Sequence, residues 1–115
     1  MGTDLEEQRL DVLFTALSDR TRRDIVARLG TGEATVKELA EPYAMSMQAV
    51  SQHIRVLERS GLISQGRHRQ TRPCRLEPAA LETALSWIEE SRRTWSERMD
   101  RLEAQLASLQ GRENQ

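Results

Sequence analysis

Polar side chains gather on one face of the segment that begins at Ser46, a good N-cap for a helix, and ends at Ser60. In a helix, which turns about 100° per residue, Val50, Ile54 and Leu57 would face inward at spacings i, i+4 and i+7. Glutamine can pair with adenine and arginine with guanine through two hydrogen bonds, so the opposite face suits the major groove of DNA. An ordinary solvated helix face is the alternative. The residues of this segment predicted to contact DNA are Ser46, Gln48, Ala49, Ser51, Gln52, His53 and Arg55.

A second group of polar residues, rich in arginine, lies between Leu62 and Leu76. Two short extended runs flank the polar centre His68–Thr71, which predicts a β-hairpin in which Pro73 is tolerated only on an edge strand. Clustered arginines repel one another unless phosphates neutralise them, so we expect the hairpin to add affinity for the DNA backbone rather than to choose a sequence. A solubilising basic loop is the alternative. The residues predicted to contact DNA here are Arg67, His68, Arg69, Gln70 and Arg72.

The overall charge of the chain conceals this basic centre. The chain has 17 Lys and Arg against 18 Asp and Glu, which gives a net charge of −1. From Ala44 to Arg75, however, six arginines stand against a single acid, Glu58. This distribution fits a chain that places one surface on phosphate and keeps the rest away from it.

Capping residues divide the first part of the chain into three helices. An amphipathic helix that contains Leu5 and Leu13 should stop near Ser18 or Asp19, and either residue can cap a second helix, RTRRDIVARL. Thr35 and Glu38 have the spacing of a capping box, which would open a third, short helix. Two short helices joined by the residues PYAM are typical of a helix-turn-helix motif.

A last helix should begin at Pro78 and run to about Leu109. Its apolar residues are spaced by alternating threes and fours, as in the seam of a coiled coil, with Arg92 as the one interruption. The seam could pack on its own domain, but the rest of the domain is too small to cover a helix of this length. We therefore expect a second copy of the chain to cover the seam. A two-fold dimer would present two copies of the helix Ser46–Ser60, called the reading helix below, to a pseudo-palindromic operator. The residues predicted at the dimer interface are Leu5, Leu13, Leu85, Ile88, Trp95, Met99, Leu102 and Leu106.

Composition favours a mostly α fold with a small β-hairpin. Aromatic residues make up 3% of the chain and charged residues 30%, a balance that suits amphipathic helices better than a β-sandwich. We expect a winged helix-turn-helix of four helices, a hairpin and a fifth helix, forming one domain over residues 1–110 with a frayed tail over 111–115. No apolar run approaches the roughly 18 residues that cross a bilayer, and the acidic N-terminus lacks the features of a signal peptide, so a cytoplasmic protein is expected.

The single cysteine, Cys74, excludes an internal disulfide and a cysteine-pair zinc site. We expect it to be a hairpin residue without a special role, and pairing between subunits or formation of an adduct is the alternative. His53 and His68 have no nucleophile paired with them, and the chain has no glycine-rich phosphate loop. We therefore predict no enzymatic activity, no cofactor and no metal.

Several stretches within residues 12–78 resemble a known family when taken together. They are LFTALSDRTRRDIVARL, TVKELAEPYAMS, SMQAVSQHIRVLERSGLI and the LEP that follows the hairpin. These stretches resemble the ArsR family of bacterial regulators. The resemblance implies a winged helix-turn-helix dimer that binds DNA as a transcriptional regulator, mostly as a repressor and often on its own operon, until an inducer releases it.

The places where this family binds metals depart from the family pattern. The familiar site on the third helix has a cysteine pair after EL, where this chain has ELAEPYAMS. The other familiar site uses histidines and acids of the last helix, and the last helix here has no histidine. The ending WSERMDRLEAQL is similar to a branch not usually associated with metals. We therefore expect no metal response through these sites, and the effector is unknown.

Two other functions remain open at the level of sequence. One is a winged-helix module that binds another protein through the same helix, and the other is a regulator that responds to an unidentified small molecule. Affinity for random duplex DNA that falls steeply with salt would favour a DNA-binding function over a protein-binding one.

Overall fold

The computed structural model of the protein describes residues 2–66 and 72–113. The chain divides into two compact units, Met1–Ala84 and Leu85–Gln115. The first unit contains the helix-turn-helix region and a sheet, and the second is part of one helix. Within the described ranges, no helix combines the length and the apolarity that crossing a membrane requires.

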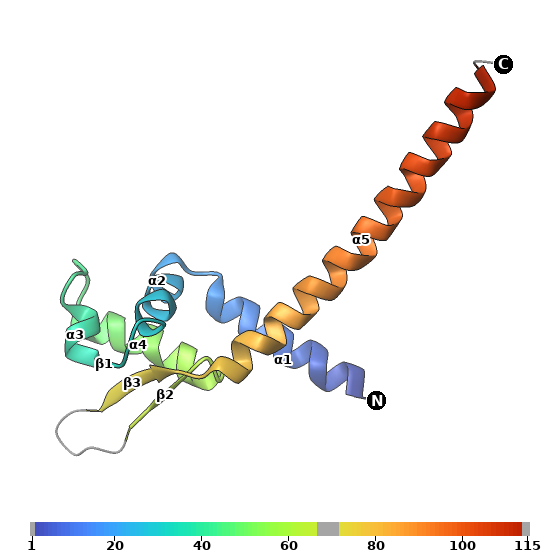
Figure 1. Ribbon diagram of the computed structural model, residues 1–115. Coiled ribbons are helices and arrows are strands. Elements are labelled where there is room, and N and C mark those ends of the chain that lie inside the picture. The colour runs from blue at the N-terminus through green and yellow to red at the C-terminus, as the bar shows by residue number, and fades with distance from the viewer. Residues whose placement is uncertain (1, 67–71, 114–115) are drawn as a thin grey trace. The chain divides into compact units, whose positions relative to one another are not determined.

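The helices and strands follow the predicted order, with one added strand. In chain order they are α1 (Gly2–Leu17), α2 (Arg20–Leu29), β1 (Ala34–Thr35), α3 (Val36–Ala40), α4 (Met47–Arg59), β2 (Ile63–Gln65), β3 (Pro73–Leu76) and α5 (Pro78–Glu113) (Figure 1). This order confirms the mostly helical fold with a small antiparallel sheet. The sequence did not indicate β1, because its two residues form a strand only through pairing with β3 and show no alternation of their own.

Three helices begin at the caps that the sequence predicts. The carboxylate of Asp19, before α2, accepts a hydrogen bond from a backbone N–H three residues later at 3.1 Å. Thr35 and Glu38 form the reciprocal capping box at the start of α3. The hydroxyl of Ser46 accepts a hydrogen bond from the N–H of Ala49 at 3.1 Å. Each such cap stabilises its helix by about 1 kcal/mol.

A glycine turn ends α4 and leads directly into the sheet. Gly61 has a φ of +84°, a left-handed conformation that favours glycine. Its N–H donates to the carbonyl of Glu58 at 3.0 Å, and the N–H of Leu62 donates to the carbonyl of Leu57 at 3.2 Å. These two bonds are the Schellman pattern, and they place Leu62 in the core one residue before β2 begins.

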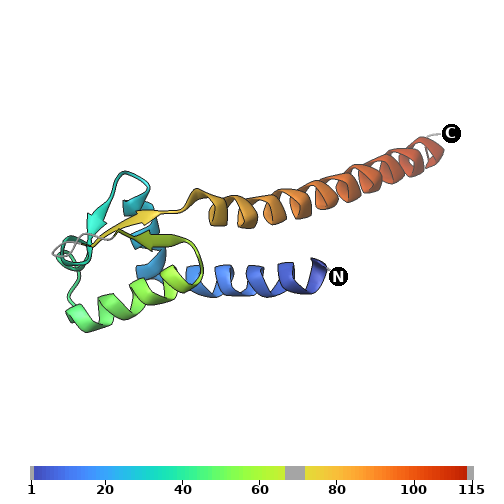
Figure 2. The ribbon, with the colours of Figure 1, turned by 90° about the horizontal axis from the view of Figure 1, so that it is seen from below.

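Strand β3 lies in the middle of the antiparallel sheet, between β1 and β2 (Figure 2). Cys74 of β3 pairs with Ala34 on one side and with Gln65 on the other. The expectation that Pro73 requires an edge strand is therefore wrong. Pro73 is the first residue of β3, where its missing N–H is tolerated, and its carbonyl still accepts a hydrogen bond from the Gly66 N–H at 2.8 Å.

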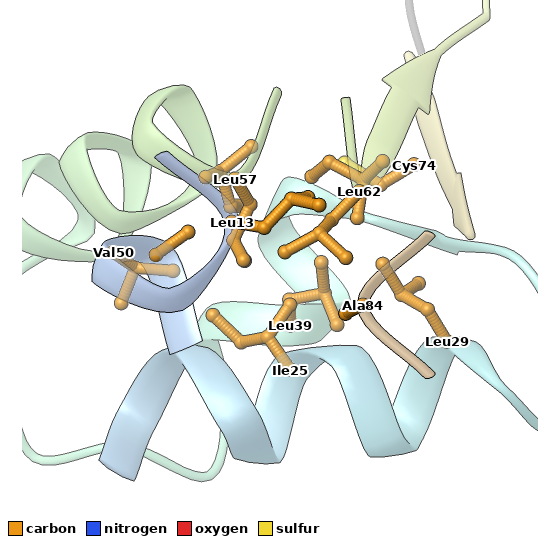
Figure 3. Close-up of a cluster of buried hydrophobic side chains, with 12 residues drawn as sticks. Leu13, Ile25, Leu29, Leu39, Val50, Leu57, Leu62, Cys74 and Ala84 are labelled. Carbon is orange, nitrogen blue, oxygen red and sulfur yellow. The ribbon is translucent and has the colours of Figure 1, made fainter. Parts of the chain in front are cut away.

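The core of the first unit draws side chains from all five helices and from the sheet (Figure 3). The largest fully buried side chains are Leu13, Ile25, Leu39, Ile54, Leu57, Leu62, Ile63, Val50 and Cys74. Ala84 is the residue of α5 that is buried in this cluster, with Ala80 and Leu81 packed beside it. The core therefore uses only the first two turns of α5.

Leu13 belongs to this core and not to an exposed surface. Its side chain is 1% exposed, and Leu10 and Ala16, three residues before and after it, are buried on the same side of α1. The prediction that Leu13 contributes to a dimer interface is therefore wrong, because the core of its own chain occupies that face. Leu5, the other residue of α1 in that prediction, is 70% exposed.

Helix α5 extends further than the sequence predicts. Residues 111–113, predicted as part of a frayed tail, are helical, and residues 114–115 lie outside the described part of the chain. Gly111 does not have the positive φ of a glycine that ends a helix, so α5 continues through it. The exposed apolar side chains of its predicted seam are Leu85, Ile88, Trp95, Met99, Leu102, Leu106 and Leu109.

Candidate nucleic-acid interface

Helix α4 carries the predicted reading face on the side opposite the core. The inward residues Val50, Ile54 and Leu57 are buried, as their spacing requires. Among the residues predicted to contact DNA, the exposed ones are Ser46, Gln48, Gln52 and Arg55, and the half-buried ones are Ala49, Ser51 and His53. Gln48, Gln52 and Arg55 follow one another at i, i+4 and i+7, so two amides and a guanidinium form one exposed stripe.

Side chains of α2 contact the short helix α3 and the turn that follows it. The guanidinium of Arg28 donates to the carbonyls of Leu39 at 2.9 Å and Glu38 at 3.0 Å, which lie in the last turn of α3. Arg28 also lies 5.7 Å from the ring centroid of Tyr43, whose hydroxyl donates to the Asp24 carboxylate. Burial and that hydrogen bond raise the pKa of Tyr43. The first helix of the helix-turn-helix is thereby fixed to α2.

The ring of His53 is held on the flank of the reading face by residues near the start of α2. Its Nδ1 lies 3.2 Å from Nη1 of Arg22 and 3.8 Å from the carboxylate of Asp19. Burial raises the pKa of Asp19, but hydrogen bonds from the backbone N–H groups of Arg22 and Thr21 and the positive charge of Arg22 outweigh burial, so this pKa lies below its ordinary value. Asp19 is therefore a carboxylate at neutral pH.

Strands β2 and β3 form the hairpin that follows the reading helix. Arg72 is exposed directly before β3. Arg75, also exposed, donates from Nε to the Ser64 hydroxyl at 3.3 Å, and the same atom lies 3.5 Å from the Glu77 carboxylate. The other residues of the hairpin predicted to contact DNA, which lie outside the described residues, are Arg67, His68, Arg69 and Gln70. The antiparallel strands confirm the hairpin, and contacts from its tip stay a prediction.

No three His, Cys, Asp or Glu side chains come together as metal ligands would within residues 2–66 and 72–113. Cys74 is buried in the core. Burial, with the negative charge of Glu58, raises the pKa of its thiol to about 11. Cys74 therefore packs as a small apolar residue.

The arrangement of α3, α4 and the hairpin defines a class of protein. A short helix, a turn, a second helix with a polar outer face and an antiparallel hairpin directly after it are the parts of a winged helix-turn-helix DNA-binding domain. A family model described as a helix-turn-helix domain matches residues 17–65, which contain α2, α3 and α4.

Known proteins with similar sequences identify the family. The chain is 32% identical over 76 residues to the transcriptional repressor SdpR of Bacillus subtilis. This match covers 66% of this chain and 84% of SdpR. It is 42% identical over 78 residues to the HTH-type transcriptional regulator Rv2034 of Mycobacterium tuberculosis. This match covers 65% of this chain and 73% of Rv2034. The chain is also similar to the crystal structure of an ArsR family transcriptional regulator, with 36% sequence identity and a TM-score of 0.74. The match covers 78% of this chain and 93% of the chain in that structure. The chain belongs to the ArsR family and is a transcriptional regulator with a helix-turn-helix DNA-binding domain.

Proposed function

We propose that this regulator is a homodimeric repressor that binds a specific sequence of double-stranded DNA and controls its own or a neighbouring operon. The observation that carries the proposal is the exposed stripe of Gln48, Gln52 and Arg55 on α4, opposite a fully buried face. These side chains have the donors and acceptors that read base edges in the major groove. Repression is supported by the identity to SdpR, which is a transcriptional repressor.

The reading face and the hairpin contribute differently to binding. Side chains of α4 that reach base edges choose the sequence, and removing one such side chain costs about 1–3 kcal/mol of discrimination. The hairpin arginines contact phosphates, which adds affinity for any sequence and makes that affinity depend on salt. The residues assigned to this second role are Arg67, Arg69 and Arg72.

A second copy of the chain covers the apolar seam of α5. Trp95 is 62% exposed and Leu106 is 59% exposed, and the seam repeats with the spacing of a coiled coil. A row of large apolar side chains left in water is typical of an interface. The exposed Leu5 of α1 is assigned to the same interface. Two copies related by a two-fold axis present two α4 helices to a pseudo-palindromic operator.

The usual metal sites of the family are not the means of control in this proposal. The segment ELAEPYAMS, which contains most of α3, offers no thiolate, and α5 has no histidine. In this proposal, any signal that the regulator receives therefore acts through something other than these two sites.

A salt titration tests the proposal. Affinity for a random duplex, measured by fluorescence anisotropy, should fall linearly with salt on logarithmic axes. Replacing Arg67, Arg69 and Arg72 by alanine should weaken binding to all duplexes and flatten the slope by about 0.9 for each phosphate that the variant no longer neutralises. The control removes three exposed arginines of α5, Arg93, Arg98 and Arg101, and should leave the slope unchanged. Absence of binding at low salt would overturn the proposed function, and an unchanged slope in the hairpin variant would overturn the role of the hairpin.

A further inference from the structure

Arg22 joins three helices of the first unit through a single guanidinium. Its Nε donates to the Ala16 carbonyl at 2.6 Å and its Nη2 to the Thr15 carbonyl at 3.0 Å, both in the last turn of α1. Its Nη1 lies 3.2 Å from Nδ1 of His53 on α4. Because Arg22 is itself in the first turn of α2 and half-buried, one side chain connects α1, α2 and α4.

The contact with Arg22 selects one form of the His53 ring. An arginine side chain has five N–H donors and no acceptor, so Nδ1 of His53 must accept this hydrogen bond. The ring proton then lies on Nε2. The Asp19 carboxylate, 3.8 Å from Nδ1, attracts a proton to that nitrogen but is too distant for a hydrogen bond. The geometry therefore favours a neutral ring in the Nε2–H form, with 22% of the side chain exposed.

The end of α1 takes hydrogen-bond donors from α2 and from Ser18, whose N–H and hydroxyl donate to the Thr15 carbonyl at 3.1 Å and 2.6 Å. The last four carbonyls of a helix have no partner within it, and the last turn of α1 contains no basic residue. Arg22 bonds two of these carbonyls. Arg23 bonds a third, since its Nη1 donates to the Leu17 carbonyl at 2.7 Å. Of these two arginines, Arg22 also bonds a side chain of α4.

We infer that Arg22 is a positioning residue for DNA recognition, which fixes α4 against the end of α1 and presents the Nε2–H of His53 as a donor to DNA. The inference rests on the proposed function, because the acceptor of this donor is a purine N7 or a phosphate oxygen. Looser seating of α4 lowers discrimination between sequences first, because attraction to phosphate depends on charge and less on the exact orientation of the helix.

Arg22→Lys and Arg23→Lys are a matched pair of variants. Both keep the positive charge, but lysine lacks the planar fork and cannot bond two carbonyls and His53 together. For Arg22→Lys we expect the ratio of affinity for a selected duplex to affinity for a random duplex to fall about tenfold, with the random affinity changed less than about twofold. Arg23→Lys should keep the wild-type ratio. If Arg22→Lys does not fold, His53→Asn, which keeps an acceptor near Nδ1 and removes the Nε2–H, must show the same loss.

Long-range nitrogen–proton NMR correlation spectra read the tautomer of His53 directly. Wild type and Arg23→Lys should show the Nε2–H form at neutral pH, and Arg22→Lys should show a mixture of tautomers. A wild-type ring protonated at Nδ1 overturns the inference, as does an unchanged affinity ratio in Arg22→Lys, and either result leaves the proposed function standing. A wild-type protein that binds no duplex overturns both.

Discussion

Cys74 shows how the surroundings of a reactive side chain suppress its chemistry. It lies in the central strand of the sheet, pairs on both sides and is fully buried. Burial and the charge of Glu58 raise the pKa of the thiol from 9.0 to about 11. Because the thiolate is the reactive form, the native protein holds a neutral and inaccessible thiol at neutral pH.

We therefore expect Cys74 to react with a thiol reagent only after unfolding. Its folded pKa lies above the ordinary value of 9.0, so this contribution to stability is complete below pH 9 and is lost as the pH rises to about 11. The free energy of unfolding, measured with urea, should fall by about 2–3 kcal/mol over that range through this group. Cys74→Ala is the control and should lack this part of the decline. Rapid labelling of the native protein at neutral pH would contradict the account.

Single residues differ in how far the sequence predicts their roles. The exposure of Gln48, Gln52 and Arg55 follows from helical periodicity, so the sequence predicted it. The roles of Arg22 and Arg28 could not be predicted in this way. Both bond carbonyls of another helix, and spacing along one helix reports only which of its own faces is apolar.

At the scale of elements, the ends of helices were predictable because their chemistry is local. The caps at Asp19, Thr35 and Ser46 each join atoms three residues apart. Strand β1 and the central place of Pro73 depend instead on pairing between segments far apart in the chain. The direction in which Leu13 faces likewise depends on the helices that pack on α1. Local patterns carry no information about such partners.

The end of α4 gives a test at this scale. Gly61→Ala places an L residue at a φ of +84°, where space is free but the conformation is strained, so the protein should lose about 1–2 kcal/mol of stability in urea unfolding. Gly111→Ala is the matched control, since Gly111 lies in α5 with open space around its Cβ position and no positive φ. It should leave stability unchanged or raise it slightly. Equal losses in both variants would show that the turn has no special role.

At the scale of the whole molecule, the proposed dimer gives the second unit a role. Its apolar seam from Leu85 to Leu109 is exposed along its length. The first unit is complete without it, because its core closes at Ala84. A second copy that covers this seam would pair two reading helices, and the symmetry of the protein would then set the symmetry of its operator.

The proposed role of the apolar seam of α5 in dimerisation can be tested by measuring the oligomeric state of the protein. Replacing both Leu102 and Leu106 by serine removes buried apolar area from each copy, so the dissociation constant of the dimer should rise at least about a hundredfold. Sedimentation equilibrium measures this shift. The control variant replaces Asp100 and Ala104, on the opposite face of α5, by serine and should stay dimeric. A monomeric wild-type protein, or a leucine variant that dimerises as well as the control, would contradict the assignment.

Whether this chain chooses DNA by sequence can be measured by selection from a library of random duplexes. Wild type should enrich a pseudo-palindromic motif with half-sites centred about one helical turn apart, roughly 10 base pairs. Gln52→Ala should enrich the same motif with preference relaxed at one position in each half-site, by about 1–3 kcal/mol. A protein that binds the library but returns the sequence composition of the input would contradict the claim and leave only attraction to phosphate.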